Sequence, residues 1–95
     1  MILSTYTFDG DPETLLEGHR RMMAFFPPDS LDLHIALTTD AGLVVFDSCP
    51  DLPTHEAFVV SPEFLGTLDR VSLPRPRIQV LGEVHFATMN QSVLR

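Results

Sequence analysis

The spacing of apolar residues changes period several times along the chain, and these changes restrict the fold more than any other feature. Residues 1–8 alternate apolar and small polar side chains, which predicts a β-strand, whereas the next segment repeats its apolar residues at the period of an α-helix. The same switches recur further along. The predicted elements are strand 1–8, helix 12–26, strand 31–39, strand 43–48, a broken helix 52–60 and 62–70, and strand 78–87.

Short polar residues next to prolines mark the ends of the predicted helices. Asp11-Pro12 and Ser61-Pro62 each place a side-chain acceptor before a proline, which is typical of a helix N-terminus. Asp51 is the expected N-cap of the second helix, and the fresh start at Ser61 predicts that this helix is broken. Pro27-Pro28 is expected to end the first helix, because proline lacks the N–H that a helix interior needs.

The order of these elements, β-α-β-β-α-β, indicates the α+β class. It favours a ferredoxin-like sandwich: a four-stranded antiparallel sheet in the order 4-1-3-2, with both helical segments on one face. The loop 40–42 ends in a glycine that we expect in the left-handed conformation of a hairpin. The chain of 95 residues has room for one domain, which we place at 1–87, followed by a loose tail at 88–95.

The apolar content is high for a domain of this size. Hydrophobic residues make up 44% of the chain, although a small domain has only a thin core in which to bury them. The helices can cover one face of the sheet, and the other face is predicted to carry Leu3, Val44, Phe46 and Leu81. We therefore expect a homodimer in which two sheets cover each other.

The charge balance excludes several classes of partner. The formal net charge is −7, with 13 acidic residues against 6 basic ones, which argues against nucleic acid and against an anionic membrane surface. No apolar run is long enough to span a membrane, and the N-terminus has no basic segment typical of a secretory signal. The single cysteine, Cys49, excludes an internal disulfide. A cytoplasmic location fits these features.

One stretch resembles a known family. The pair Phe46-Asp47 at a strand end, the helix start at Asp51 and the run 57–64 (Ala-Phe-Val-Val-Ser-Pro-Glu-Phe) are similar to motifs of antibiotic-biosynthesis-monooxygenase-like proteins. The resemblance implies a dimeric α+β barrel, built from two ferredoxin-like sheets. Catalytic members are cofactor-independent oxygenases or haem-degrading enzymes. This chain lacks the tryptophan that such members often use, and Phe58 replaces the family's helix histidine.

A candidate site follows from His19, which lies within the apolar arc of the first helix. Together with Tyr6, it could serve as a general base or hydrogen-bond anchor in an apolar pocket between sheet and helices. The alternative is a core histidine whose ring is hydrogen-bonded by Tyr6 or Ser4. The expected pocket walls are Met22, Met23, Phe26, Phe58 and Phe64.

Further polar residues are assigned to the edges of this pocket or to the dimer. Asp47 and His55 are expected near the pocket mouth, where they would contact the substrate, with surface or capping roles as the alternative. His34, Glu83 and His85 are expected on the outer face of the sheet. Their spacing does not match a metal site, so hydrogen bonding across the dimer is the better interpretation and no metal or other cofactor is predicted.

Two functions from different classes fit these features. The first is a small enzyme, monooxygenase-like or isomerase-like, that acts on a small apolar or aromatic metabolite without a cofactor, with His19 as base and Tyr6 as hydrogen-bond partner. The second is a non-catalytic homodimer that binds a small ligand or serves as a structural unit. The missing tryptophan and the missing family histidine favour the second.

Overall fold

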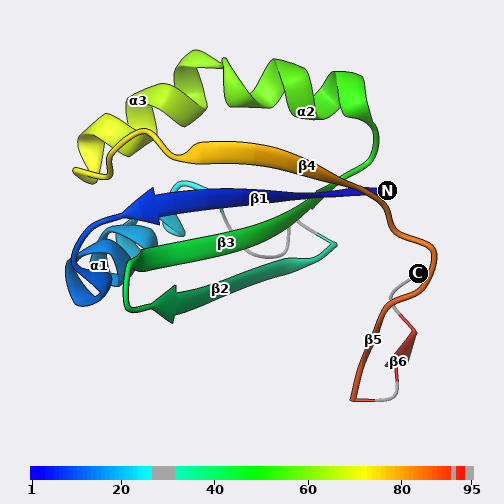
Figure 1. Cartoon of the computed structure of the whole chain (residues 1–95). Coiled ribbons are helices and arrows are strands. Elements are labelled where there is room, and N and C mark those ends of the chain that lie inside the picture. Colours follow the sequence, from blue (N-terminus) through cyan, green and yellow to red (C-terminus); the bar gives the residue numbers. More distant parts are fainter. Residues whose placement is uncertain (27–31, 91, 94–95) are drawn as a thin grey trace.

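The computed structural model describes residues 1–26, 32–90 and 92–93 and has the predicted α+β architecture (Figure 1). Four antiparallel strands form one sheet in the order β2-β3-β1-β4, which confirms the predicted order 4-1-3-2. The elements are β1 (Ile2–Asp9), α1 (Pro12–Met22), β2 (His34–Thr39), β3 (Gly42–Cys49), α2 (Leu52–Val59), α3 (Pro62–Arg70), β4 (Arg77–Glu83), β5 (Thr88–Met89) and β6 (Ser92–Val93).

All three predicted helix starts are confirmed by side-chain caps. The carboxylate of Asp11 accepts from the backbone N–H of Thr14 at 2.9 Å, and that of Asp51 accepts from Thr54 at 2.8 Å. The hydroxyl of Ser61 accepts from the backbone N–H of Phe64 at 3.2 Å. This third cap begins α3 directly after α2, so the predicted break of the second helix is confirmed.

The first helix is shorter than predicted. It ends at Met22 instead of Phe26, and the backbone N–H groups of Ala24 and Phe25 bond three residues back, to Arg21 and Met22. Such bonds belong to a tighter turn than an α-helix. The turn precedes Pro27-Pro28, which lie outside the described residues, as does Leu31 at the predicted start of the second strand.

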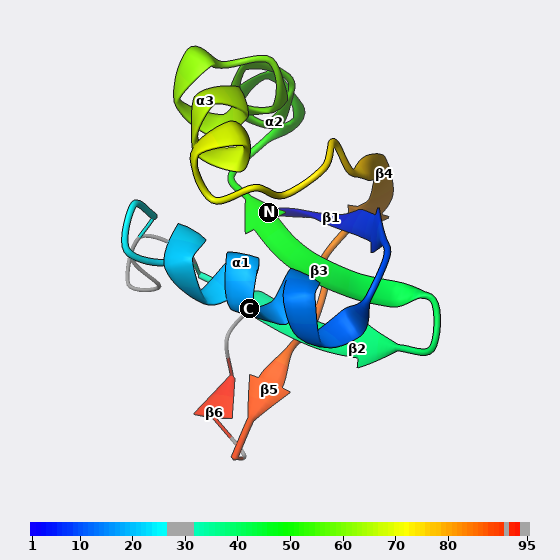
Figure 2. The ribbon, with the colours of Figure 1, turned by 90° about the vertical axis from the view of Figure 1, so that its left-hand side faces the viewer.

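One continuous core joins both helical segments to the same face of the sheet. Tyr6 and Phe8 of β1 and Leu43 and Val45 of β3 meet buried residues of α1, of α3 and of the segment after α3. Figure 2 shows that α1 covers one part of this face and that α2 and α3 cover another part of the same face. The other members of the core are Leu15, Met22, Phe64, Leu68, Val71 and Leu73.

The strand β2 presents the opposite face from the one predicted. His34 pairs with Asp47, and Ala36 pairs with Val45, a core residue, so His34 and Ala36 lie on the helix-covered side. Ile35 and Leu37 point outward instead and are 41% and 40% exposed. The expectation of His34 on the outer face is therefore wrong. A one-residue difference in register exchanges the two faces of a strand. The pairing of β2 with β3 therefore decides which residues of β2 face the helices.

Gly42 is required both by its positive φ, which favours glycine as predicted, and by a close approach between strands. It is the first residue of β3, with φ of 154°, and pairs with Asp9 and Thr39. A Cβ atom there would collide with the backbone carbonyl of Phe8. Asp40 and Ala41 alone form the turn of this hairpin.

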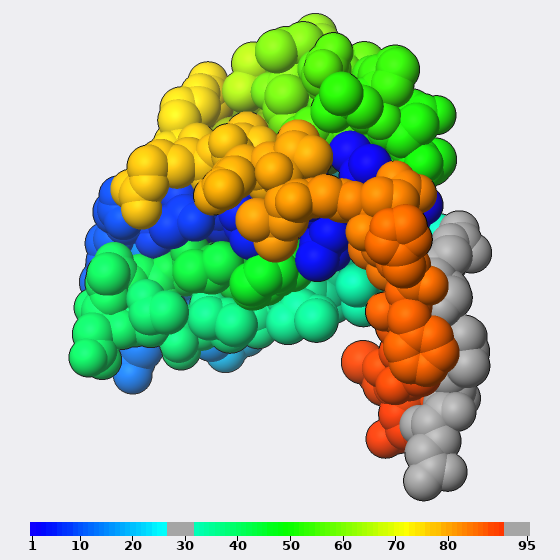
Figure 3. Space-filling view, turned by 45° about the vertical axis from the view of Figure 1, so that its right-hand side comes forward, coloured from blue at the N-terminus to red at the C-terminus, as the bar shows by residue number. Residues whose placement is uncertain are grey.

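The edge strand β4 is shorter than predicted and irregular. Leu3 pairs with Gly82 and Ser4 with Val80, so Leu81 is an extra residue in a β-bulge. The chain then leaves the sheet, and the residues expected to form a loose tail include a short ladder between β5 and β6. Figures 1 and 3 show β5 projecting away from the sheet. Positions 91, 94 and 95 of the predicted tail lie outside the described residues.

Candidate functional site

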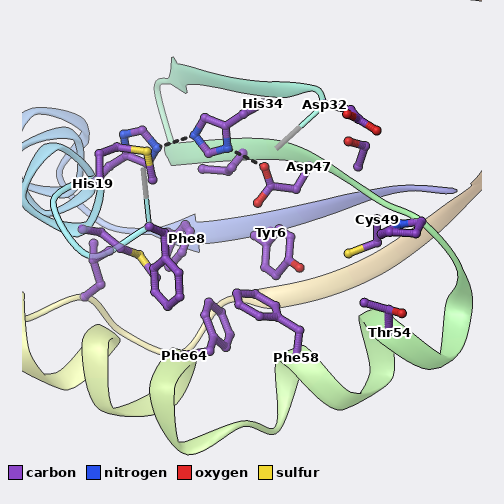
Figure 4. A pocket seen from close by; sticks show the side chains of 17 residues that line it. Tyr6, Phe8, His19, Asp32, His34, Asp47, Cys49, Thr54, Phe58 and Phe64 are labelled. Atoms are coloured by element: carbon purple, nitrogen blue, oxygen red, sulfur yellow. Dashed lines mark hydrogen bonds and ion pairs between the residues drawn. The ribbon is translucent and has the colours of Figure 1, made fainter. Parts of the chain in front are cut away.

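A cavity of about 590 Å³ lies between the inner face of the sheet and the helices (Figure 4). This volume is within the usual range for small-molecule sites, roughly 300–1,000 Å³. Apolar side chains form most of its surface, and the polar groups are few. The lining residues are Tyr6, Phe8, His19, Met22, Met23, Phe26, Asp32, His34, Val45, Asp47, Ser48, Cys49, Pro50, Thr54, Phe58, Phe64 and Leu73.

The amphipathic pattern of α1 brings His19 to this cavity. Leu15 and Met22, which are four residues before and three residues after His19, are both buried in the core, so the side chain between them faces the same way. His19 is partly buried. Its burial, and then the neighbouring His34, lower the pKa of His19, while Asp47 acts in the opposite direction. His19 is therefore held toward its neutral form, which is the form that accepts a proton.

His19 is the end of a hydrogen-bonded row of three side chains. Its Nε2 lies 2.9 Å from Nε2 of His34, and Nδ1 of His34 is hydrogen-bonded to Oδ1 of Asp47. Figure 4 shows the row along one wall of the cavity. The pairing of β2 with β3 places His34 directly opposite Asp47. The predicted alternative, in which Tyr6 or Ser4 binds the ring of His19, is therefore wrong.

Tyr6 projects into the cavity from the middle of β1. Its ring packs edge-on against Phe64, with centroids 5.8 Å apart. Burial, with smaller contributions from the neighbouring Asp47 and Cys49, raises the pKa of Tyr6, so its hydroxyl stays protonated and can donate. No hydrogen-bond partner of this hydroxyl is found among the described residues, and it is not one of their fully buried polar atoms. It is therefore open to a ligand.

Three phenylalanines form the wall that faces the sheet from the helical side. The ring centroids of Phe58 and Phe64 are 4.7 Å apart, and those of Phe26 and Phe58 are 5.7 Å apart. Met22 and Met23 extend this wall along α1. All five residues were predicted as pocket walls, and the structure places all of them there. Flat apolar molecules fit such a surface, because aromatic side chains favour edge and offset contacts with other rings.

His55 does not contribute to the cavity. It is 3% exposed, and its Nδ1 lies 3.3 Å from the hydroxyl of Ser4 under the first turn of α2. Its ring also packs edge-on against Tyr6, at 6.2 Å between centroids. The prediction of His55 at the pocket mouth is thus wrong in placement. Asp47, the other residue predicted there, does line the cavity.

His34 lies at the cavity, and not at the outer-face site expected from the sequence. It was grouped with Glu83 and His85, but Glu83 binds the N-terminal amine at 3.1 Å and His85 is exposed beyond β4. Within the described residues, no group of three potential ligands is placed to hold a metal. The hairpin pairing could have revealed His34: counting back from the turn at 40–41 sets it opposite Asp47.

Searches of family models, of curated proteins and of solved structures find no match to this chain. The family resemblance of residues 46–64 therefore stays a prediction. In the described part of the chain, no helix is long and apolar enough to cross a membrane. What the site itself offers is a neutral histidine, a carboxylate and a protonated phenol in an apolar cavity. These groups can accept, orient and donate protons.

Proposed function

We propose that this protein is a small enzyme that removes a proton from a small apolar or aromatic metabolite, with His19 as the general base. The observation that carries the proposal is the row Asp47–His34–His19 in the wall of an apolar cavity of ligand size. His19 is partly buried, and its ring is hydrogen-bonded to a second histidine that is itself held by a carboxylate. A row of three that ends in a neutral imidazole is the arrangement that general-base catalysis uses.

The remaining lining residues are assigned roles by their chemistry. Tyr6 donates a hydrogen bond to an oxygen of the bound molecule, because its hydroxyl is protonated and unpaired within the described residues. The aromatic and methionine side chains hold the apolar part. The monooxygenase-like or isomerase-like activities implied by the resemblance would both begin with removal of a proton, so the proposal is common to them.

We further propose that the protein works as a homodimer joined through the uncovered face of the sheet. Figure 3 shows strands β2, β3, β1 and β4 side by side on this face, with no helix in front of them. Ile35 and Leu37 of β2 are exposed there, and Leu81 of the bulge is exposed on β4, at the other edge of the sheet. A second copy of the chain would remove this apolar surface from water.

Proton removal can be tested without knowledge of the natural substrate. 2-Tetralone is a neutral aromatic ketone with acidic C–H groups, and NMR in D₂O measures how fast these protons exchange. We expect the protein to accelerate exchange, and His19→Gln to reduce this acceleration by at least ~100-fold, the lower end of the usual effect of a general base. His85→Gln, which changes an exposed histidine outside the cavity, is the matched control and should retain the full rate.

Two results would count against the proposal. Equal exchange rates for the His19 and His85 variants would exclude His19 as the base. Saturable binding of 2-tetralone with no acceleration would favour the alternative function, a non-catalytic dimer that binds a small apolar ligand. Native mass spectrometry of the purified protein complements this test, because a reproducible extra mass would identify the natural ligand directly.

A further inference from the structure

The contact between the two histidine rings is an end-to-end hydrogen bond. The ring planes differ by only 8°, and the ring centroids are 5.1 Å apart while the two Nε2 atoms are 2.9 Å apart. The closest approach is therefore from nitrogen to nitrogen, and not from face to face. Such a contact requires that one Nε2 carries a hydrogen and that the other offers a lone pair.

Asp47 decides which of the two nitrogens carries the hydrogen. A carboxylate only accepts hydrogen bonds, so Nδ1 of His34 donates to Asp47. A neutral imidazole has one N–H, and Nε2 of His34 is then the acceptor of the pair. His19 donates through Nε2, which leaves a lone pair on its Nδ1. No partner of this Nδ1 is found among the described residues, and it is not one of their fully buried polar atoms.

We propose that His34 and Asp47 form a proton relay behind His19, which fixes its tautomer and takes over its positive charge. When Nδ1 of His19 accepts a proton, the hydrogen on its Nε2 passes to Nε2 of His34. His19 is then neutral again with its hydrogen on Nδ1, and His34 becomes the imidazolium, hydrogen-bonded to the Asp47 carboxylate. One proton enters, one is shifted, and no other bond changes. The part that the relay plays in catalysis rests on the proposed function, in which His19 is the general base.

The surroundings favour the charge on His34 over the charge on His19. Burial opposes a cation on His19, whereas a cation on His34 forms a charge-assisted hydrogen bond with Asp47. Within the part of the chain that the structure describes, the other titratable groups that line the cavity are Tyr6, Asp32 and Cys49. The helices α2 and α3 present only Thr54, Phe58 and Phe64 to it, and none of these side chains titrates near neutral pH. In the relay His34 and Asp47 act as positioning residues through His19, and all three side chains line the cavity.

NMR of the full chain with ¹⁵N-labelled histidine tests the relay directly, because ¹⁵N shifts distinguish protonated from unprotonated ring nitrogens. At high pH we expect hydrogen on Nδ1 of His34 and on Nε2 of His19. On acidification, the first proton taken up by the pair should leave both nitrogens of His34 protonated, while the hydrogen of His19 moves to Nδ1. A cation that forms on His19 while His34 stays neutral would overturn the inference.

A pair of variants separates the charge of Asp47 from its hydrogen bond. Asp47→Asn keeps an acceptor oxygen, so the high-pH tautomers should persist, but the pair should protonate roughly one pH unit lower or more, as expected when a close opposite charge is lost. Asp40→Asn removes the same charge from the exposed turn between β2 and β3. It should leave unchanged the pH at which the histidine pair is half protonated. Equal midpoints in the two variants would overturn the relay.

The relay and the proposed function fail in different ways. If the tautomers are as stated but His19→Gln does not slow exchange of 2-tetralone, the relay stands and the proposed function is wrong. If His19→Gln slows exchange but the tautomers are reversed, His19 is a base without a relay. The tautomers are measured on the unmodified protein, so this part of the test does not depend on whether a variant folds.

Discussion

The charged side chains that line the cavity all belong to acidic residues or histidine. Among the described residues, Asp32 and Asp47 supply the carboxylates of the lining, and neither lysine nor arginine contributes to it. Burial, and then Asp47 and Asp51, raise the pKa of Cys49, so its thiol stays neutral and is a poor nucleophile. An anionic ligand would lose its hydration here and meet like charges. The site should therefore select neutral molecules.

A matched pair of aromatic probes tests this charge selection. We expect 1-naphthol, which is neutral at pH 7, to bind at least ~10-fold more tightly than the anion 1-naphthoate, since a modest like-charge repulsion of about 1.4 kcal/mol gives this ratio. Isothermal titration calorimetry measures both. Asp47→Asn should reduce the difference in affinity between 1-naphthol and 1-naphthoate, and Asp40→Asn should leave this difference unchanged. Tighter binding of 1-naphthoate to the unmodified protein would show that the cavity recognises anions.

The helix caps on α1 and α2 make stability depend on pH in a defined direction. Hydrogen bonds from Thr14 and Thr54 lower the pKa values of Asp11 and Asp51 below their ordinary value of 3.8. The contribution of each charged cap is therefore fully present above pH ~4 and is lost as the pH falls through the lower, folded-state pKa. Both carboxylates are exposed, so solvent and salt screen part of the effect.

Replacing both caps should make this dependence visible. We expect Asp11→Asn with Asp51→Asn to lower the urea midpoint of unfolding at pH 7, because asparagine caps a helix without the favourable charge at the N-terminus. Urea unfolding followed by circular dichroism from pH 7 to pH 2.5 measures this midpoint for both proteins. We expect the difference between the midpoints of the double variant and the unmodified protein to shrink below pH ~4. A constant difference over this range would mean that the caps act without their charge.

The face that each strand presents could be predicted only where the apolar pattern agrees with the core. In β1 three of the four residues at even positions are large and apolar and all four are buried, so the prediction of Tyr6 on the inner face is confirmed. In β2 the apolar residues at odd positions point outward, and the pattern alone pointed to the wrong face. Helix caps and prolines act locally, which is why helix starts were predicted well, whereas His34 required the pairing of two strands.

The same difference explains which part of the site was found from the sequence. Residues on one helix, such as His19 and Met22, share a face by spacing alone, so their place in the cavity could be predicted. The hydrogen bond from His34 to Asp47 depends on register, and the burial of His55 depends on how α2 packs over the sheet. Neither is encoded in a local motif.

The outward Ile35 and Leu37 also bear on how many copies of the chain assemble. A specific dimer should bury about 1,200–2,000 Å² in total. We expect the protein to be a dimer at micromolar concentration, and Leu37→Lys to shift it to the monomer, because a charge would be buried in the contact. Native mass spectrometry measures the masses. Thr38→Lys adds the same charge on the opposite face of β2 and should leave the dimer intact.

If the Leu37→Lys variant is still a dimer, the interface lies elsewhere on the molecule. If the unmodified protein is a monomer at all concentrations, the proposed homodimer is wrong. The projecting segment with β5 and β6 lies beyond the sheet, so a variant that ends after residue 87 would show whether this segment adds to the contact. The interface through the sheet predicts that the shortened chain still forms a dimer.

A space of about 590 Å³ in so small a protein also has a thermodynamic consequence. Where side chains would otherwise pack, the native state forgoes dispersion contacts, and a molecule that fills the space restores them. Any such molecule raises the melting temperature by mass action, and at 100 times its dissociation constant it adds about 2.7 kcal/mol to the free energy of unfolding. Under the proposed function, the bound metabolite completes the packing of the hydrophobic core, and a rise in melting temperature would report its binding before any reaction is known.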